Sequence, residues 1–215
     1  MTSAFVLLRA TAVRLAGLAL LLLPETACEN SPELQPALVG EANASRYVAI
    51  GGSITAGLMN GGLYRAGQQV AYPNLLARQM GLAGGRRDFA QPLFGEEEEN
   101  GTGYRLLTNV TPLTYQAVTD KLALRGQTPT LYTKFGGDNQ NLGVPNLRVA
   151  DLNTPGYGSA AGNPLFERLL PVGQEQKTYL QYVVESRPTF FTVWLGNADL
   201  LQFVTSGGTR PLTET

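Results

Sequence analysis

Two apolar runs, each followed by a glycine-containing turn and the start of a helix, constrain the fold of this chain more than any other feature. The first is Arg46–Ile50, which ends at Gly51 and Gly52, and the second is Thr189–Leu195, which ends at Gly196. Short apolar runs bounded by turn residues are typical of strands covered on both faces of a sheet. Strand–turn–helix units in series predict an α/β fold with a mostly parallel sheet, whose functional groups lie at the carboxyl ends of the strands.

The remaining elements are placed by periodicity and by turn residues. The pattern indicates loops at 154–164 and at Glu96–Glu99, where contiguous carboxylates beside Asn100 and Gly101 lack the alternating spacing of an EF-hand calcium loop. The signal at 146–152 fits either a strand or a helix. Helices are predicted at 53–58, 72–80, 178–184 and 200–203, with some helical character at 112–120.

The N-terminal segment has the pattern of an export signal. Arg9 and Arg14 precede an uninterrupted apolar run, 15–23, which is too short to cross a bilayer comfortably. Small residues stand just before Cys28, which resembles the lipidated cysteine of bacterial lipoproteins; simple secretion with an unused thiol is the alternative. We expect an exported chain, anchored to an envelope membrane through Cys28 or else secreted. Its expected segments are a signal peptide at 1–28, a linker at 29–45 and one domain at 46–215.

Composition excludes several classes of function. Lys+Arg 16 against Asp+Glu 17 argues against binding to nucleic acid, because that affinity depends on Lys and Arg neutralising phosphates. A single cysteine excludes an internal disulfide and a cysteine-based zinc site. The chain has no histidine, so it contains no histidine ligand, proton shuttle or general base. We expect neither a metal nor a cofactor.

Three turns fall where such a sheet carries its chemistry. Ser53 follows the first run, where its hydroxyl can project from the sheet edge beside helix-start N–H groups that stabilise an oxyanion. Gly143 lies in a later turn and allows close approach of the backbone to a ligand, and Asn197 follows the second run and can donate to an oxyanion. The alternatives are a helix N-cap for Ser53 and ordinary turn residues for the other two. No Gly-Lys-Ser/Thr sequence supports a Walker-type phosphate loop.

Taken together and in this order, the motifs resemble the SGNH/GDSL hydrolase family, specifically its exported lipoprotein branch of Bacteroidetes type. The resemblance runs from about Arg46 to the end of the chain. The matching stretches are YVAIGGSITAG at 47–57, NGGLY at 60–64, AYPNLLA at 71–77, NLGVP at 141–145 and WLGNAD at 194–199.

This resemblance implies a flavodoxin-like, three-layer α/β/α sandwich and ester hydrolysis through an acyl-serine. By it, Ser53 is the nucleophile, and the oxyanion hole consists of the Ser53 and Gly143 N–H groups with the Asn197 side chain. Asp199 is implied to fix its turn rather than to act in catalysis. The implied substrate is a small-molecule, glycan or lipid ester.

The sequence departs from the family pattern in two places. Gly52 stands where the family has Asp or Asn before the serine, and the Asp-x-x-His motif of the family's C-terminal part is absent. A serine without an assisting base is a weak nucleophile at neutral pH. By resemblance, a last strand, closing helices and the acid–base pair should follow. We therefore expect the N-terminal part of a longer hydrolase, with apolar sheet surface left uncovered.

Three functions from different classes remain open at this stage. The first is a serine ester hydrolase that is inactive as given, because it has no histidine. The second is a catalytically dead, lipid-anchored module that binds acylated glycans or lipids. The third is a structural lipoprotein of the cell envelope, in which the three turns serve only as scaffold.

Overall fold

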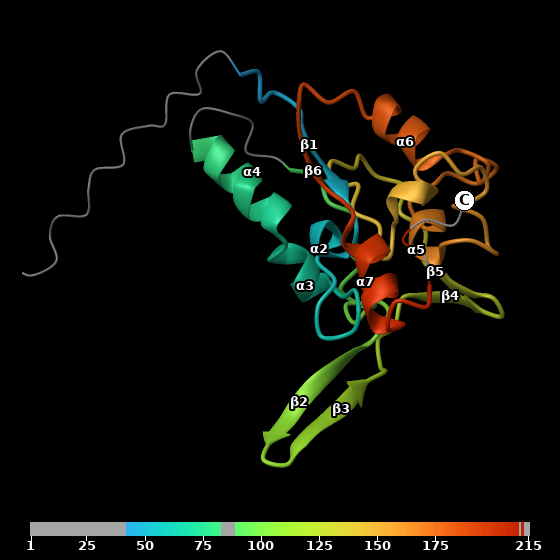
Figure 1. The fold of residues 1–215 in the computed structure, drawn as a ribbon. Coiled ribbons are helices and arrows are strands. Elements are labelled where there is room, and N and C mark those ends of the chain that lie inside the picture. The colour runs from blue at the N-terminus through green and yellow to red at the C-terminus, as the bar shows by residue number, and fades with distance from the viewer. Residues whose placement is uncertain (1–41, 83–88, 211, 213–215) are drawn as a thin grey trace, which may run out of the picture. The chain divides into compact units, whose positions relative to one another are not determined.

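The computed structural model describes residues 42–82, 89–210 and 212 (Figure 1). The expected signal segment with Cys28 lies outside these residues, as does most of the expected linker. In the part of the chain that the structure describes, no helix is both long enough and apolar enough to cross a bilayer. The elements in chain order are β1 (Tyr47–Gly51), α2 (Ser53–Ala56), α3 (Arg65–Gln69), α4 (Tyr72–Leu82), β2 (Tyr104–Val110), β3 (Leu113–Val118), β4 (Leu124–Gln127), β5 (Thr130–Tyr132), the 3-10 helix η1 (Val149–Asp151), α5 (Pro164–Glu167), α6 (Tyr179–Glu185), β6 (Phe190–Trp194) and α7 (Asn197–Thr205).

Parallel strand pairing at β1 confirms the expected mixed α/β class. β1 and β6 pair in parallel, with Tyr47 opposite Phe190 at one end of the ladder. Residues 140–144 run along the other edge of β1, where the Leu142 N–H donates to the Ala49 carbonyl at 2.8 Å. β1 is therefore flanked on both edges, and the turns after these segments lie at their carboxyl ends.

Both faces of β1 are buried, which explains its continuous apolar sequence. Successive side chains of a strand point to opposite faces, so Val48 and Ile50 pack on one side while Tyr47 and Ala49 pack on the other. The first cluster also contains Leu142, Val144, Leu147, Phe166, Leu169, Leu170 and Tyr179, and the second also contains Ala77 of α4.

β6 is less covered than its sequence predicts. Phe191 and Val193 are each 55% exposed, and no residue of α7 is buried. The prediction that this run is covered on both faces is wrong for these two side chains. The physical reason is that neither side chain belongs to the clusters packed on the two faces of β1, so no described segment covers this face of β6.

Two antiparallel hairpins between the parallel segments were not predicted. The expected helical character at 112–120 is wrong, because Leu113–Val118 forms β3 and pairs with β2. β4 and β5 form the second hairpin. Two of the three strand pairs are thus antiparallel, so the expectation of a mostly parallel sheet is wrong for the described residues. Parallel pairing occurs around β1 and in one isolated bridge between Gly101 and Leu122.

The helix predictions at α2, α4 and α6 are confirmed, and α7 begins at Asn197, earlier than predicted. α6 starts where Thr178 accepts a hydrogen bond from the Gln181 N–H, a capping box typical of helix starts. The ambiguous stretch at 146–152 contains η1 rather than a strand or an α-helix.

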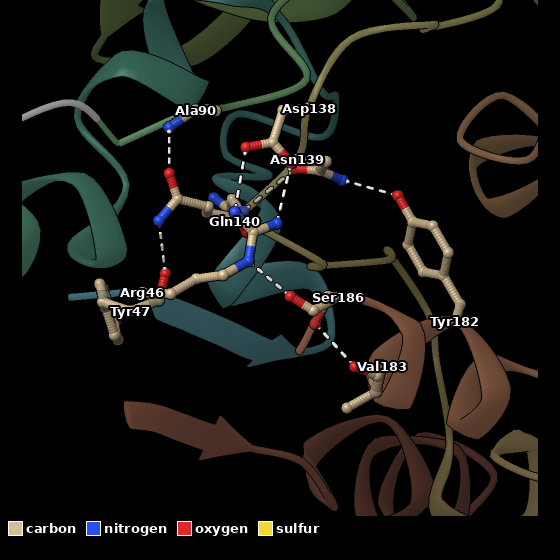
Figure 2. A network of polar contacts seen from close by, with 10 residues as sticks. Arg46, Tyr47, Ala90, Asp138, Asn139, Gln140, Tyr182, Val183 and Ser186 are labelled. Carbon is tan, nitrogen blue, oxygen red and sulfur yellow. Dashed lines mark hydrogen bonds and ion pairs between the residues drawn. The ribbon is translucent and has the colours of Figure 1, made fainter. Parts of the chain in front are cut away.

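Polar contacts fix the amino-terminal end of β1 (Figure 2). Arg46 donates to the Asp138 carboxylate at 2.8 Å and to the Ser186 carbonyl at 2.5 Å. Gln140 donates to the Tyr47 carbonyl at 2.9 Å. These bonds tie β1 to the 138–140 segment and to the end of α6. Because the strand is held in place at this end, the turn at its carboxyl end starts from a fixed position.

Candidate functional site

Ser53 is the first residue of α2 and is separated from the end of β1 by Gly52 alone. The Gly52 N–H donates to the Trp194 carbonyl at 3.2 Å, which ties this turn to the end of β6. The Ser53 Oγ is partly exposed and accepts a hydrogen bond from the Asn146 N–H at 3.1 Å. Within the described residues, no ionisable side chain is hydrogen-bonded to this hydroxyl. The serine therefore has a fixed position but no base beside it.

Gly143 lies against α2 from the side of the 140–144 segment. A Cβ built on Gly143 would stand 2.3 Å from the Ala56 nitrogen, so no larger residue fits. The Gly143 N–H donates to the Asn141 Oδ1 at 3.1 Å, and the Asn141 Nδ2 donates to the Thr55 carbonyl at 3.0 Å. The close backbone approach expected at this glycine thus occurs, but against a helix of the same chain, and its N–H already has an acceptor.

Asn197 begins α7 at the end of β6, after Gly196, whose φ of 91° is in the left-handed region that glycine favours. The Asn197 Oδ1 is buried and accepts no hydrogen bond from the described residues. It lies 3.6 Å from the position that a Cβ on Gly52 would occupy. Asn197 therefore lies beside the serine turn, and its buried Oδ1 lacks a hydrogen-bond partner among the described residues.

Asp199 acts on the loop that contacts Ser53. Both of its carboxylate oxygens lie 3.1 Å from the Val149 nitrogen and accept its N–H. Val149 begins η1, a few residues after Asn146, whose N–H holds the serine hydroxyl. Asp199 thus ties α7 to the 146–149 loop, a fixing role that extends beyond its own turn.

Tyr179 supports the site, and the sequence interpretation missed it. Its fully buried hydroxyl donates to the Leu142 carbonyl at 2.8 Å and accepts from the Gly51 N–H at 3.1 Å. Burial also raises the pKa of this phenol, so the hydroxyl keeps its proton and can donate. The helical pattern of 178–184 could have placed Tyr179 on a buried face, but no sequence signal indicates the two backbone groups that it joins.

The acidic stretch at 96–99 is held by contacts with neighbouring side chains. The Arg65 guanidinium lies 3.7 Å from the Glu96 carboxylate, and the Lys121 ammonium lies 2.6 Å from the Glu99 carboxylate. The Thr133 hydroxyl donates to the Glu98 carboxylate at 2.7 Å. Among the residues that the structure describes, no three Cys, Asp or Glu side chains are grouped as metal ligands. This block is therefore a surface loop held by local cations.

A cavity at the opposite end of β1 is a weaker candidate. It has a volume of about 330 Å³ and is lined by Arg46, Asp138, Lys177 and Tyr182, among others. Its charges are paired within the chain, since Arg46 bonds Asp138 and Lys177 bonds Glu185. These four charged groups of the lining are thus engaged with one another, which makes this cavity a weaker candidate than the serine turn.

A side chain at position 52 is expected to stabilise the protein. The φ of Gly52 is −95°, and a Cβ there meets its nearest atoms at 3.6 Å. Gly52→Asn should raise the free energy of unfolding by about 0.5–1.5 kcal/mol, because it restricts the unfolded chain and can donate to the Asn197 Oδ1. Urea unfolding measures the change.

The neighbouring glycine provides the control. A Cβ on Gly51 would stand 2.1 Å from the Thr55 Oγ1 and 2.5 Å from the Trp194 carbonyl oxygen. Gly51→Ala should therefore lower the free energy of unfolding by about 1–3 kcal/mol. Equal effects at positions 51 and 52 would contradict the packing described for this turn.

Comparisons of the chain with protein-family models, with curated proteins and with solved structures found no match. A hydroxyl at a strand end, amides at a helix start and a neighbouring carboxamide can together stabilise negative charge on an acyl oxygen. They cannot by themselves remove the serine proton.

Proposed function

We propose that this chain carries the acyl-transfer serine of an SGNH/GDSL-type ester hydrolase. One observation carries the proposal: Ser53, the 141–146 loop and Asn197 come together at the carboxyl ends of three parallel segments. Such an edge is where open α/β sheets bind ligands. In this assignment Ser53 is the nucleophile, and its own N–H and the Asn197 side chain stabilise the oxyanion.

The packing around β1 supports the three-layer α/β/α arrangement that belongs to this assignment. Ala77 of α4 lies against one face of β1, and Phe166 of α5 and Tyr179 of α6 lie against the other. Gly143 also fits the assignment by position. Its N–H can act on an oxyanion only if the Asn141 Oδ1 moves away or shares it.

The missing base sets the rate that we expect. The chain has no histidine, and no ionisable group in the described residues bonds to Ser53. In serine proteases that lose a triad member, the oxyanion hole and substrate binding leave about 10³–10⁴-fold catalysis over water. We therefore expect slow acylation of Ser53 by this chain, and turnover only with a base from outside it.

A fluorophosphonate probe tests this assignment. We expect slow labelling of Ser53, faster when imidazole is added as an external base, and none at that position in Ser53→Ala. Mass spectrometry of the labelled peptide identifies the site. Ser45→Ala, which alters an exposed serine before β1, should label like the parent chain. Labelling that persists in Ser53→Ala, or that ignores imidazole, would contradict the proposal.

A binding module for acylated glycans or lipids is the second candidate. The observation that favours it is the Gly143 N–H, which is already donated to Asn141, beside a serine without a base. Calorimetric binding of an acylated sugar, weakened in Asn197→Ala, together with no labelling of Ser53 would select this function. In either case we propose export of the chain and lipid anchoring at Cys28.

A further inference from the structure

The β2–β3 hairpin has an unusual composition. Residues 106–119 contain no Asp, Glu, Lys or Arg, although charged residues make up 15% of the chain. Every residue from 105 to 117 is exposed. The hairpin extends away from the other elements of residues 42–210 (Figure 1). An exposed segment of this length without a charge needs a physical reason.

The pairing register gives the distal half of the hairpin one apolar face. Leu107 pairs with Tyr115, and Val110 pairs with Leu113 beside the turn. These four side chains are 50%, 55%, 74% and 58% exposed in that order, so exposure is greatest at the tip. Because paired residues and residues two apart in a strand share a face, all four lie on one side of the ribbon.

The opposite face is mainly polar and uncharged. Thr108 and Thr114 lie on it, with their hydroxyl oxygens 3.0 Å apart, and Gln116 follows. Leu106 is the apolar exception on this side. The hairpin is therefore amphipathic, and its polar face can form hydrogen bonds with water or with lipid headgroups.

Contacts at its root hold the hairpin in place. The Arg105 N–H donates to the Asn60 carbonyl at 2.8 Å, and the Tyr104 ring stacks on Tyr64 with centroids 4.1 Å apart. A two-stranded hairpin alone is only marginally stable in water. Anchoring at the root thus supports a distal half whose four apolar side chains stay at least half exposed.

We propose that the distal half of this hairpin inserts its apolar face into the interfacial region of a lipid bilayer. A narrow tip can enter a bilayer surface end-on, whereas a stable protein interface needs about 800 Å² on each partner. Charged side chains resist such insertion, and residues 106–119 have none. Tyr and Thr are suited to headgroup depth. The unpaired backbone edges of β2 and β3 keep the hairpin at the interface, because hydrocarbon cannot satisfy them.

The proposed lipid on Cys28 favours the same partner. Fully extended, the chain from Cys28 to Ala42 reaches at most about 50 Å, so a lipid on that cysteine would keep the domain near a membrane. Stable anchoring commonly needs a second signal besides one lipid chain. This support for a membrane partner rests on the proposed lipid anchoring at Cys28. The composition and geometry of the hairpin do not depend on that anchoring. The test therefore uses a chain from which Cys28 has been removed.

The test measures the environment of a dye on the hairpin itself, in the full chain. In a Cys28→Ser background, Val110→Cys carries an environment-sensitive nitrobenzoxadiazole dye, and the protein is mixed with phosphatidylethanolamine–phosphatidylglycerol vesicles. We expect blue-shifted, stronger dye emission, quenched by lipids brominated near the headgroup. The same dye at Gln116→Cys, on the polar face, should respond less. Because the signal arises at the hairpin, binding through the apolar run at 15–23 does not imitate it.

A charge-matched pair of variants separates apolar insertion from electrostatics. Placing the dye at Thr111→Cys in the turn, we expect Val110→Asp with Leu113→Asp to weaken the vesicle-dependent dye response about tenfold. Thr114→Asp with Gln116→Asp adds the same charge to the polar face and should change it less than about twofold. Equal losses in the two pairs would overturn the proposal. So would no dye response while the protein sediments with vesicles, or dye burial that depends on protein concentration without vesicles, which indicates a second copy of the chain.

Discussion

Tyr179→Phe is expected to lower the free energy of unfolding by about 2–4 kcal/mol, because it leaves two buried backbone groups without a hydrogen-bond partner. In the folded protein, the Tyr179 hydroxyl donates to the Leu142 carbonyl at 2.8 Å and accepts from the Gly51 N–H at 3.1 Å. The side chain is fully buried, so water does not replace these bonds without opening the cluster. Urea unfolding followed by Trp194 fluorescence measures the loss.

Tyr182→Phe is the matched control on the same helix. Its hydroxyl accepts one hydrogen bond, from the Asn139 Nδ2 at 3.0 Å, and its side chain is partly exposed. We expect a cost of about 1 kcal/mol for this variant. Tyr179→Phe should also slow fluorophosphonate labelling, because Gly51 leads into the Ser53 turn. A cost no larger than that of Tyr182→Phe would show that Tyr179 does not hold the site together.

Local patterns account for the part of the fold that the sequence predicted. β1 and α4 carry short-range signals, an apolar run ending at glycines and a helical face opened by Pro73, and both elements form as expected. The prediction of helical character misses β3, in which Leu113, Tyr115 and Ala117 alternate with polar residues as is typical of a strand. The half-exposed Phe191 agrees with the expectation of uncovered apolar sheet surface. Which side chains of β6 would be exposed could not be foreseen, because it depends on which segments pack against that strand.

The site was predictable only where it follows strand ends. Ser53 and Asn197 each come directly after an apolar run, so their common edge could be inferred from topology. The group that holds the Ser53 hydroxyl comes from Asn146, 93 residues away, and the phenol that holds Gly51 comes from 128 residues away. Contacts across such separations leave no periodic trace in the sequence, so they required the structure.

Stability is expected to fall steeply as the pH rises above about 10. Burial raises the pKa of Tyr47 and of Tyr157 to about 12 and also raises that of Tyr179. Tyrosines of the unfolded chain ionise near pH 10. Between about pH 10 and 12 the unfolded state therefore binds fewer protons than the folded state, and the free energy of unfolding decreases with pH. Below about pH 10 this contribution is fully present.

Arg168 changes the free energy of unfolding with pH in the opposite direction. Burial lowers the pKa of its guanidinium to about 10, so the folded state releases that proton before the unfolded state does and gains stability as the pH rises. Between its pKa in the unfolded chain and its pKa in the folded protein, each of these groups changes the free energy of unfolding by about 1.4 kcal/mol per pH unit. Tyr47, Tyr157 and Tyr179 against Arg168 give a net loss of about 2–3 kcal/mol per pH unit, less any screening at the half-buried Tyr157. Burial also raises the pKa of Tyr132 and of Tyr182, which adds to the loss.

Urea unfolding at a series of pH values, with tyrosinate absorbance recorded in parallel, tests this balance. Tyr157→Phe removes one of the raised groups and should make the alkaline decline shallower by up to about 1.4 kcal/mol per pH unit. At neutral pH it should cost about 1 kcal/mol, because its hydroxyl accepts from the Asn163 Nδ2 at 2.9 Å. A free energy of unfolding that stays level between about pH 10 and 12 in the parent chain would mean that these phenols ionise while folded. The buried cluster that holds Gly51 and Leu142 would then be open to water.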